Sequence, residues 1–167
     1  MSEENRKIAF ICSKGNLDMV YPALVMGWAA LGNGIDVTIF FTFWGMDMIR
    51  ELRVDNLQIA PVANTSMKMS MMGVDTGNLG IPNVMGVLPG MTAFATKLMK
   101  DKMEGLEIPP VREYLEMLVD AGAELYACKM SVDMFDLEKD DFFPCVIDIV
   151  TAGDIMDMTD GAQIVFI

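Results

Sequence analysis

The chain has 167 residues, 53% hydrophobic and 22% charged, which is typical of one globular domain and excludes a disordered chain. Its formal net charge of -12 argues against nucleic acid or anionic membrane surfaces as partners, because both require a basic surface. It contains no histidine, which excludes Ser-His-Asp and Cys-His hydrolysis and His-ligated catalytic metals. Any chemistry must use cysteine, carboxylate, lysine or backbone groups, and we predict no metal site and no cofactor.

The first third of the chain predicts two buried strands joined by an apolar helix. Residues 7–12 form a continuous apolar run typical of a strand buried on both faces. Residues 17–31 predict a helix, with Asn16 as its cap and the segment from Gly32 to Gly34 as its end. Residues 35–41 predict a second strand and 46–52 a short helix. Because the first helix is apolar nearly all round, we expect it to pack on a partner subunit in a homo-oligomer.

A methionine-rich insertion is expected at about residues 57–105 of a single domain spanning 1–167. Up to about residue 90 it shows no hydrophobic periodicity, and Pro, Gly and Asn are interspersed with methionines, among them Met67, Met69, Met71 and Met72. A helix is expected at 92–102. Methionine is pliable and suits partner-binding surfaces. The apolar segment 84–99 is shorter than the roughly 20 residues of a transmembrane helix. It predicts no transmembrane span and leaves peripheral membrane contact open.

The last third alternates strands and helices. Pro109 and Pro110 open a helix that runs to about residue 121. Strands are expected at 123–127, 145–149 and 162–167, and short helices at 129–135 and 151–158. This rhythm predicts a three-layer, flavodoxin-like α/β fold, with a five-stranded, mostly parallel sheet and helices on both faces. A strand order of 2-1-3-4-5 would make the strands ending at Cys12 and Cys128 neighbours at the switch point.

Cys128 is the predicted nucleophile. It lies where a buried strand meets the start of a short helix, whose unpaired backbone N–H groups and dipole favour the thiolate. Lys129 adds a positive charge beside it, and Met130 is expected to line the site. The alternative is an inert, buried thiol.

The other two cysteines are less informative. Cys12 is either the end of a core strand or a second, resolving thiol for Cys128, and Cys145 is expected to be structural. The odd number and the lack of a CxxC motif support neither a secreted disulfide framework nor a zinc knuckle. The polar N-terminus, residues 1–7, is not a signal peptide, so we expect a cytoplasmic protein with reduced thiols.

A polar loop follows the first strand: Ser13, Lys14, Gly15 and Asn16. A flavodoxin-type loop would bind phosphate here, but the glycine-rich phosphate patterns are missing. We therefore expect these four residues to line the thiol site, with Lys14 supplying positive charge.

Four stretches together resemble the DsrE/DsrF-like sulfur-relay family, in particular the DsrE-like subgroup sometimes labelled peroxiredoxin-family: residues 12–18, 21–22, 39–45 and 125–133. The resemblance implies a three-layer α/β domain that assembles into homo- or hetero-oligomers. It also implies that the cysteine after the third core strand, here Cys128, accepts sulfane sulfur as a persulfide. This sulfurtransferase-like carrier would then pass the sulfur to a partner protein's thiol.

Two other functions stay open at this point. The chain could be a non-catalytic, oligomeric adaptor that works through its apolar first helix and methionine-rich segment. It could also be a thiol redox protein that uses Cys12 together with Cys128. A carrier needs Cys128 alone, a redox protein needs both thiols, and an adaptor needs neither.

Overall fold

The computed structural model describes residues 6–62, 64, 67, 80 and 82–167. These residues belong to two compact units, Met1–Leu57 with Pro110–Ile167, and Gln58–Pro109. The predicted methionine cluster lies mostly outside the described residues, since only Met67 among its four methionines is described. The division into one domain with an insertion at about 57–105 stays a prediction.

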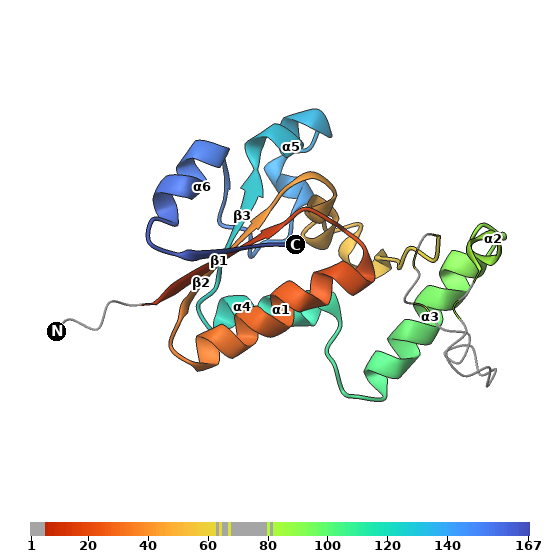
Figure 1. Ribbon diagram of the computed structural model, residues 1–167. Coiled ribbons are helices and arrows are strands. Elements are labelled where there is room, and N and C mark those ends of the chain that lie inside the picture. The colour runs from red at the N-terminus through yellow and green to blue at the C-terminus, as the bar shows by residue number, and fades with distance from the viewer. Residues whose placement is uncertain (1–5, 63, 65–66, 68–79, 81) are drawn as a thin grey trace. The chain divides into compact units, whose positions relative to one another are not determined.

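The first unit is built on a five-stranded parallel sheet (Figure 1). Its strands are β1 (Lys7–Cys12), β2 (Asp36–Phe41), β3 (Glu124–Cys128), β4 (Asp148–Val150) and β5 (Gln163–Phe166). The spatial order is β4-β3-β2-β1-β5. The predicted α/β class and parallel sheet are confirmed, whereas the order 2-1-3-4-5 is wrong because β2 lies between β1 and β3.

The packing of two helices explains this order. α1 (Leu17–Gly32) connects β1 to β2, α4 (Val111–Asp120) precedes β3, and the two helices contact each other on one face of the sheet. Right-handed crossovers on the same face step in the same direction across a sheet. The chain therefore continues from β1 through β2 to β3 and does not reverse at β1.

The α1–α4 layer is close-packed around a glycine. A Cβ at Gly27 would lie 3.4 Å from Leu118 of α4 and 3.6 Å from Val37 of β2, so the small residue lets the helix approach both. The predicted helix at 17–31 is confirmed, with Asn16 at the N-cap position but without a side-chain capping bond.

The opposite face carries α5 (Lys129–Met134) and α6 (Ala152–Met158), as Figure 1 shows. Ile155 of α6 packs in a cluster with Phe40, Tyr126 and Cys128. The three layers are therefore α1 with α4, the sheet, and α5 with α6.

Short 3₁₀ helices replace some predicted elements. The helix expected at 46–52 is η1 (Phe43–Met48), which η2 (Val54–Asn56) follows. Another 3₁₀ helix, η4 (Lys139–Asp141), precedes β4. The strand expected at 145–149 begins only at Asp148. Its earlier residues belong to a turn that starts at Phe143, whose N–H donates to the Ile49 carbonyl at 2.8 Å and whose carbonyl accepts from Val146.

The second unit contains α2 (Asn83–Gly86) and α3 (Met91–Glu104). The N–H of Ile59 donates to the Thr96 hydroxyl at 3.1 Å, and this hydrogen bond joins the start of the unit to α3. Over the described part of the chain, no helix has both the length and the apolar character needed to cross a membrane.

Candidate functional site at the carboxyl edge of the sheet

Cys128 is the last residue of β3 and occupies the N-cap position of α5. Its backbone is extended, with φ -75° and ψ 118°, and the helix begins at the next residue. Only 4% of the residue is exposed. The β3-to-α5 junction thus holds the thiol below the surface, beside backbone N–H groups that have no partner within the helix.

Hydrogen bonds decide the ionisation of this thiol. Burial by itself raises the pKa of Cys128, since a thiolate is poorly solvated in the protein. Donors at Thr42 (hydroxyl), Ser131 (backbone and hydroxyl) and Met130 (backbone) favour the thiolate and lower the pKa. These donors outweigh burial, so the pKa lies below its ordinary value.

The two hydroxyls belong to one buried network. The oxygens of Thr42 and Ser131 lie 3.2 Å apart, and the N–H of Phe43 donates to the Ser131 hydroxyl at 2.8 Å. Ser131 is fully buried and Thr42 nearly so. Because Thr42 follows β2 and Ser131 lies on α5, the network joins the ends of two adjacent strands around Cys128.

A strained residue holds part of this network. Phe43 has a φ of 46°, a left-handed conformation that is costly for an aromatic residue. In this conformation its N–H reaches Ser131, and the next residue, Trp44, stacks on Phe135 with ring centroids 5.0 Å apart. The start of η1 therefore contacts α5 at Ser131 and the C-cap residue of α5 at Phe135.

Two glycines let the loops at this edge approach each other. A Cβ at Gly45 would lie 2.1 Å from the carbonyl oxygen of Cys12, and one at Gly15 would lie 2.4 Å from that of Trp44. The N–H of Thr42 also donates to the Cys12 carbonyl at 3.0 Å. The end of β1 thus supports η1, and through Thr42 it supports the thiol.

The predicted lining loop reaches the site through η1. Gly15 packs against the Trp44 backbone, and the Ser13 hydroxyl donates to the Ile167 carbonyl at 2.9 Å. Lys14 is exposed and Asn16 stands at the start of α1. The donors that surround the Cys128 sulfur come instead from Thr42 and α5.

Lys129 and Met130 both lie on the first turn of α5 and both are exposed. The Lys129 ammonium pairs with the carboxylate of Asp133 one turn later. Its charge is therefore compensated, and the lowered pKa of Cys128 is explained by hydrogen bonds. Met130 contributes its backbone to the sulfur while its side chain faces solvent.

Cys12 does not lie beside Cys128. Cys12 pairs with Phe41 and Phe41 pairs with Ala127, so these three residues share one face of the sheet. Cys128 follows Ala127 and points to the opposite face. The two thiols are also two strands apart, about 10 Å, beyond the roughly 7 Å between Cα atoms that a disulfide spans. The expectation that they end neighbouring strands is wrong.

The remaining thiols lack the donors of Cys128. Burial raises the pKa of Cys12 to about 12. Cys145 is half-buried in the turn before β4, and burial raises its pKa to about 11. Of the three cysteines, Cys128 alone has a lowered pKa.

Sequence reasoning assigned neither Thr42 nor Ser131 to the thiol site. Both stand within the segments that resemble the sulfur-relay family, but the wrong strand order separated them. With β2 placed next to β3, a hydroxyl directly after β2 is the natural partner for a thiol directly after β3.

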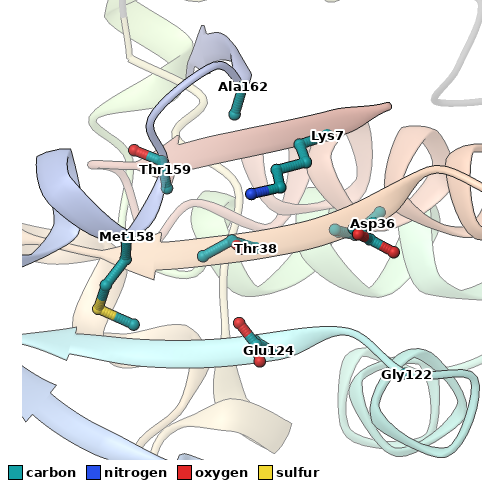
Figure 2. Close-up of a pocket in the computed structure, with 9 residues that line it drawn as sticks. Lys7, Asp36, Thr38, Gly122, Glu124, Met158, Thr159 and Ala162 are labelled. Atoms are coloured by element: carbon teal, nitrogen blue, oxygen red, sulfur yellow. The ribbon is translucent and has the colours of Figure 1, made fainter. Parts of the chain in front are cut away.

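A polar hollow of about 370 Å³ lies at the other edge of the sheet. Figure 2 shows Lys7, Thr38 and Glu124 converging there from β1, β2 and β3, with Met158 and Thr159 from the end of α6 and the residue after it. Its lining residues contain no thiol. It lies at the amino ends of the strands, whereas Cys128 lies at a carboxyl end, so it is separate from the thiol site.

The fold and the site define a parallel α/β protein with one buried cysteine of lowered pKa at the carboxyl edge of its sheet. The family model described as DsrE/DsrF/DrsH-like matches residues 4–167, and the chain belongs to that family. It is 35% identical over 139 residues to the sulfur carrier protein DsrE2 of Allochromatium vinosum, which covers 83% of this chain and 84% of that protein.

Two further proteins are similar over nearly the whole chain. The uncharacterized protein YrkE of Bacillus subtilis is 24% identical over 167 residues, with 100% of both chains covered. The solved structure of MTH1491, a protein of unknown function from Methanobacterium thermoautotrophicum, matches with a TM-score of 0.56 at 10% identity, covering 97% of this chain and 99% of that one. The structural match supports the fold.

Proposed function

We propose that this protein is an intracellular sulfur carrier, in which Cys128 accepts sulfane sulfur as a persulfide and passes it to the thiol of a partner protein. The observation that carries the proposal is the position of Cys128, a buried thiol at the N-cap of α5 beside the paired hydroxyls of Thr42 and Ser131, with a pKa below its ordinary value. Membership of the sulfur-relay family and similarity to a protein named as a sulfur carrier support it.

The chemistry needs no general base. In the loading step the Cys128 thiolate attacks the outer sulfur of a donor persulfide, the donor's S–S bond breaks, and the donor leaves as a thiolate. In the unloading step an acceptor thiolate attacks the same sulfur, and Cys128 is the leaving group. A leaving thiol of lower pKa leaves faster, so the hydrogen bonds that favour the thiolate of Cys128 assist the second step.

Some of the site residues would bind the sulfur of Cys128, and others would position the loops around it. Thr42, Ser131 and the backbone at Met130 would hold the thiolate and the perthiolate. Gly15 would support η1 from behind, with the adjoining Ser13, Lys14 and Asn16 in the same loop. Lys129 would remain ion-paired with Asp133, and Cys12 would be a core residue, because it lies on the other face of the sheet.

The proposal is tested by mass spectrometry after incubation with inorganic polysulfide. We expect the wild-type protein to gain the mass of one sulfur atom on the Cys128 peptide, removable by dithiothreitol. The Cys128→Ser variant should gain none, whereas Cys145→Ser should behave as wild type. An adduct that survives in Cys128→Ser, or a wild-type protein that gains no sulfur, would contradict the proposal.

We also propose that the carrier is a cytoplasmic homo-oligomer. The outer side of α1 exposes Val25, Met26 and Trp28, an apolar surface that a second copy of the chain would cover. Light scattering on wild type and Met26→Glu measures this. A monomeric wild-type protein at the concentration of the transfer assay would refute it.

A further inference from the structure

We infer that an exposed apolar rim beside Cys128, made of Phe43, Trp44, Met130 and Met134, docks a cationic, apolar segment of the acceptor protein that carries the receiving cysteine. This inference rests on the proposed function and names the partner chemistry of the same site. The rim would make the protein prefer protein thiols over small thiols.

The rim comes from the two elements that hold the thiol. Phe43 and Trp44 open η1, and Met130 and Met134 lie one turn apart on α5. All four side chains are exposed, with Trp44 at 64% and Met134 at 49%. Tryptophan, phenylalanine and methionine are enriched in protein interfaces, and methionine adapts to different partners.

The rim is braced and not merely exposed. The Trp44 ring stacks on Phe135, the Phe43 N–H is bonded to Ser131, and Gly15 packs against the Trp44 carbonyl. Phe43 keeps its left-handed conformation in spite of the conformational cost. Strain of this kind persists where the surrounding structure enforces it and clusters at functional sites. The Trp44 ring is thus held in place while exposed, so its burial by a partner costs little further entropy.

Charge complementarity identifies the occupant as cationic. From the start of α5, residues 129–141 contain five acidic residues and two lysines. The whole chain carries a net charge of -12. Such a field speeds the encounter with a positively charged partner and disfavours an anionic one. A segment with lysine or arginine around an apolar cysteine motif fits both the rim and its surroundings.

The transfer itself balances without an oxidant. The acceptor thiolate attacks the outer sulfur of the Cys128 persulfide, a new S–S bond forms on the acceptor, and the old S–S bond breaks to give the Cys128 thiolate. Because Cys128 is only 4% exposed, the acceptor sulfur must be brought to it along the surface formed by η1 and α5. A small thiol has too little apolar surface to gain from contact with the rim, whereas a protein segment can cover it.

The experiment loads the protein with polysulfide and measures the rate constant of sulfur transfer to three probes. These are N-acetylcysteine, a cysteine peptide with leucine and arginine neighbours, and the same peptide with aspartate in place of arginine. We expect the arginine peptide to react fastest. Trp44→Ala should lower the rate with that peptide by roughly tenfold, as for an aromatic interface anchor, and leave the rate with N-acetylcysteine within about twofold.

Two further variants keep the result interpretable. Met134→Lys places a like charge on the rim at an exposed position, so it should slow the arginine peptide and spare N-acetylcysteine. Phe166→Ala removes an aromatic side chain of similar exposure, 70%, from edge strand β5 and should change neither rate. Equal loss with both probes in Trp44→Ala, or no loss with the peptide in Trp44→Ala and Met134→Lys, would overturn the inference.

Docking is also measured without sulfur chemistry, by calorimetry with an arginine peptide that carries serine in place of cysteine. Binding that Trp44→Ala abolishes supports the rim even if no persulfide forms on Cys128, a result that would overturn the proposed function alone. A persulfide that forms normally on a protein that does not bind the peptide would overturn the rim alone.

Discussion

Replacing Thr42 by valine should make the Cys128 thiolate harder to form. Valine keeps the shape and the β-branch of threonine but removes the hydroxyl that hydrogen-bonds to the sulfur and lies 3.2 Å from the Ser131 oxygen. The Met130 and Ser131 donors remain. We therefore expect the pKa of Cys128 to rise in Thr42→Val while the fold is kept.

The size of the effect follows from the strength of one bond. A hydrogen bond to a charged group contributes about 1.5 kcal/mol at the lower end of its range, which lowers the thiolate fraction about tenfold at pH values below the pKa. The more basic thiolate is also intrinsically more nucleophilic, which recovers about threefold. The rate of alkylation by iodoacetamide should fall about threefold at such pH values. Where the thiol is fully ionised, the variant should react faster than wild type by a similar factor.

The assay is the rate of alkylation of the Cys128 peptide as a function of pH. Thr38→Val is the matched control. Thr38 lies on β2, the strand that Thr42 follows, and its side chain is on the same face of the sheet as those of Phe40 and Thr42. It lines the separate hollow at the other edge of the sheet. Its curve should overlay that of wild type. A Thr42→Val curve that does not cross the wild-type curve would mean that access to the sulfur, and not thiolate stabilisation, had changed, and would refute the reasoning.

In the wild-type protein, alkylation near neutral pH should modify Cys128 first, because burial raises the pKa of Cys145 to about 11 and that of Cys12 to about 12. Peptide mass spectrometry that shows Cys145 modified first would contradict this. Gly45→Ala should lower the free energy of unfolding in urea by about 1–3 kcal/mol, because its Cβ would meet the Cys12 carbonyl, whereas Gly32→Ala, which meets nothing within 4 Å, should be neutral or gain up to about 1 kcal/mol. Equal stability of the two variants would exclude the steric argument. Between about pH 9 and 12 the Cys12 thiol releases its proton in the unfolded protein and retains it in the folded protein, so the free energy of unfolding should fall as pH rises. It should fall less steeply with pH in Cys12→Ala. Equal slopes for wild type and variant would show that Cys12 ionises alike in the folded and unfolded protein.

The sequence alone determined most secondary elements, because each is coded by a local pattern. The apolar run 7–12 is β1 and the apolar helix expected at 17–31 is α1, each within one residue of the observed bounds. The strand expected at 145–149 began late, because the turn at Phe143 is set by the distant Ile49 carbonyl. Patterns local to a segment carry no information about such a contact.

At the candidate site the sequence likewise determined what depends on neighbours along the chain. It placed Cys128 at a strand-to-helix junction, where backbone N–H groups are available to a thiolate. Only the tertiary structure decided which other groups surround the sulfur. Strand order follows from the face on which the crossover helices pack, and that order brought Thr42 of the β2 end to Cys128. The pleat then set Cys12 on the opposite face, because side chains alternate along each strand.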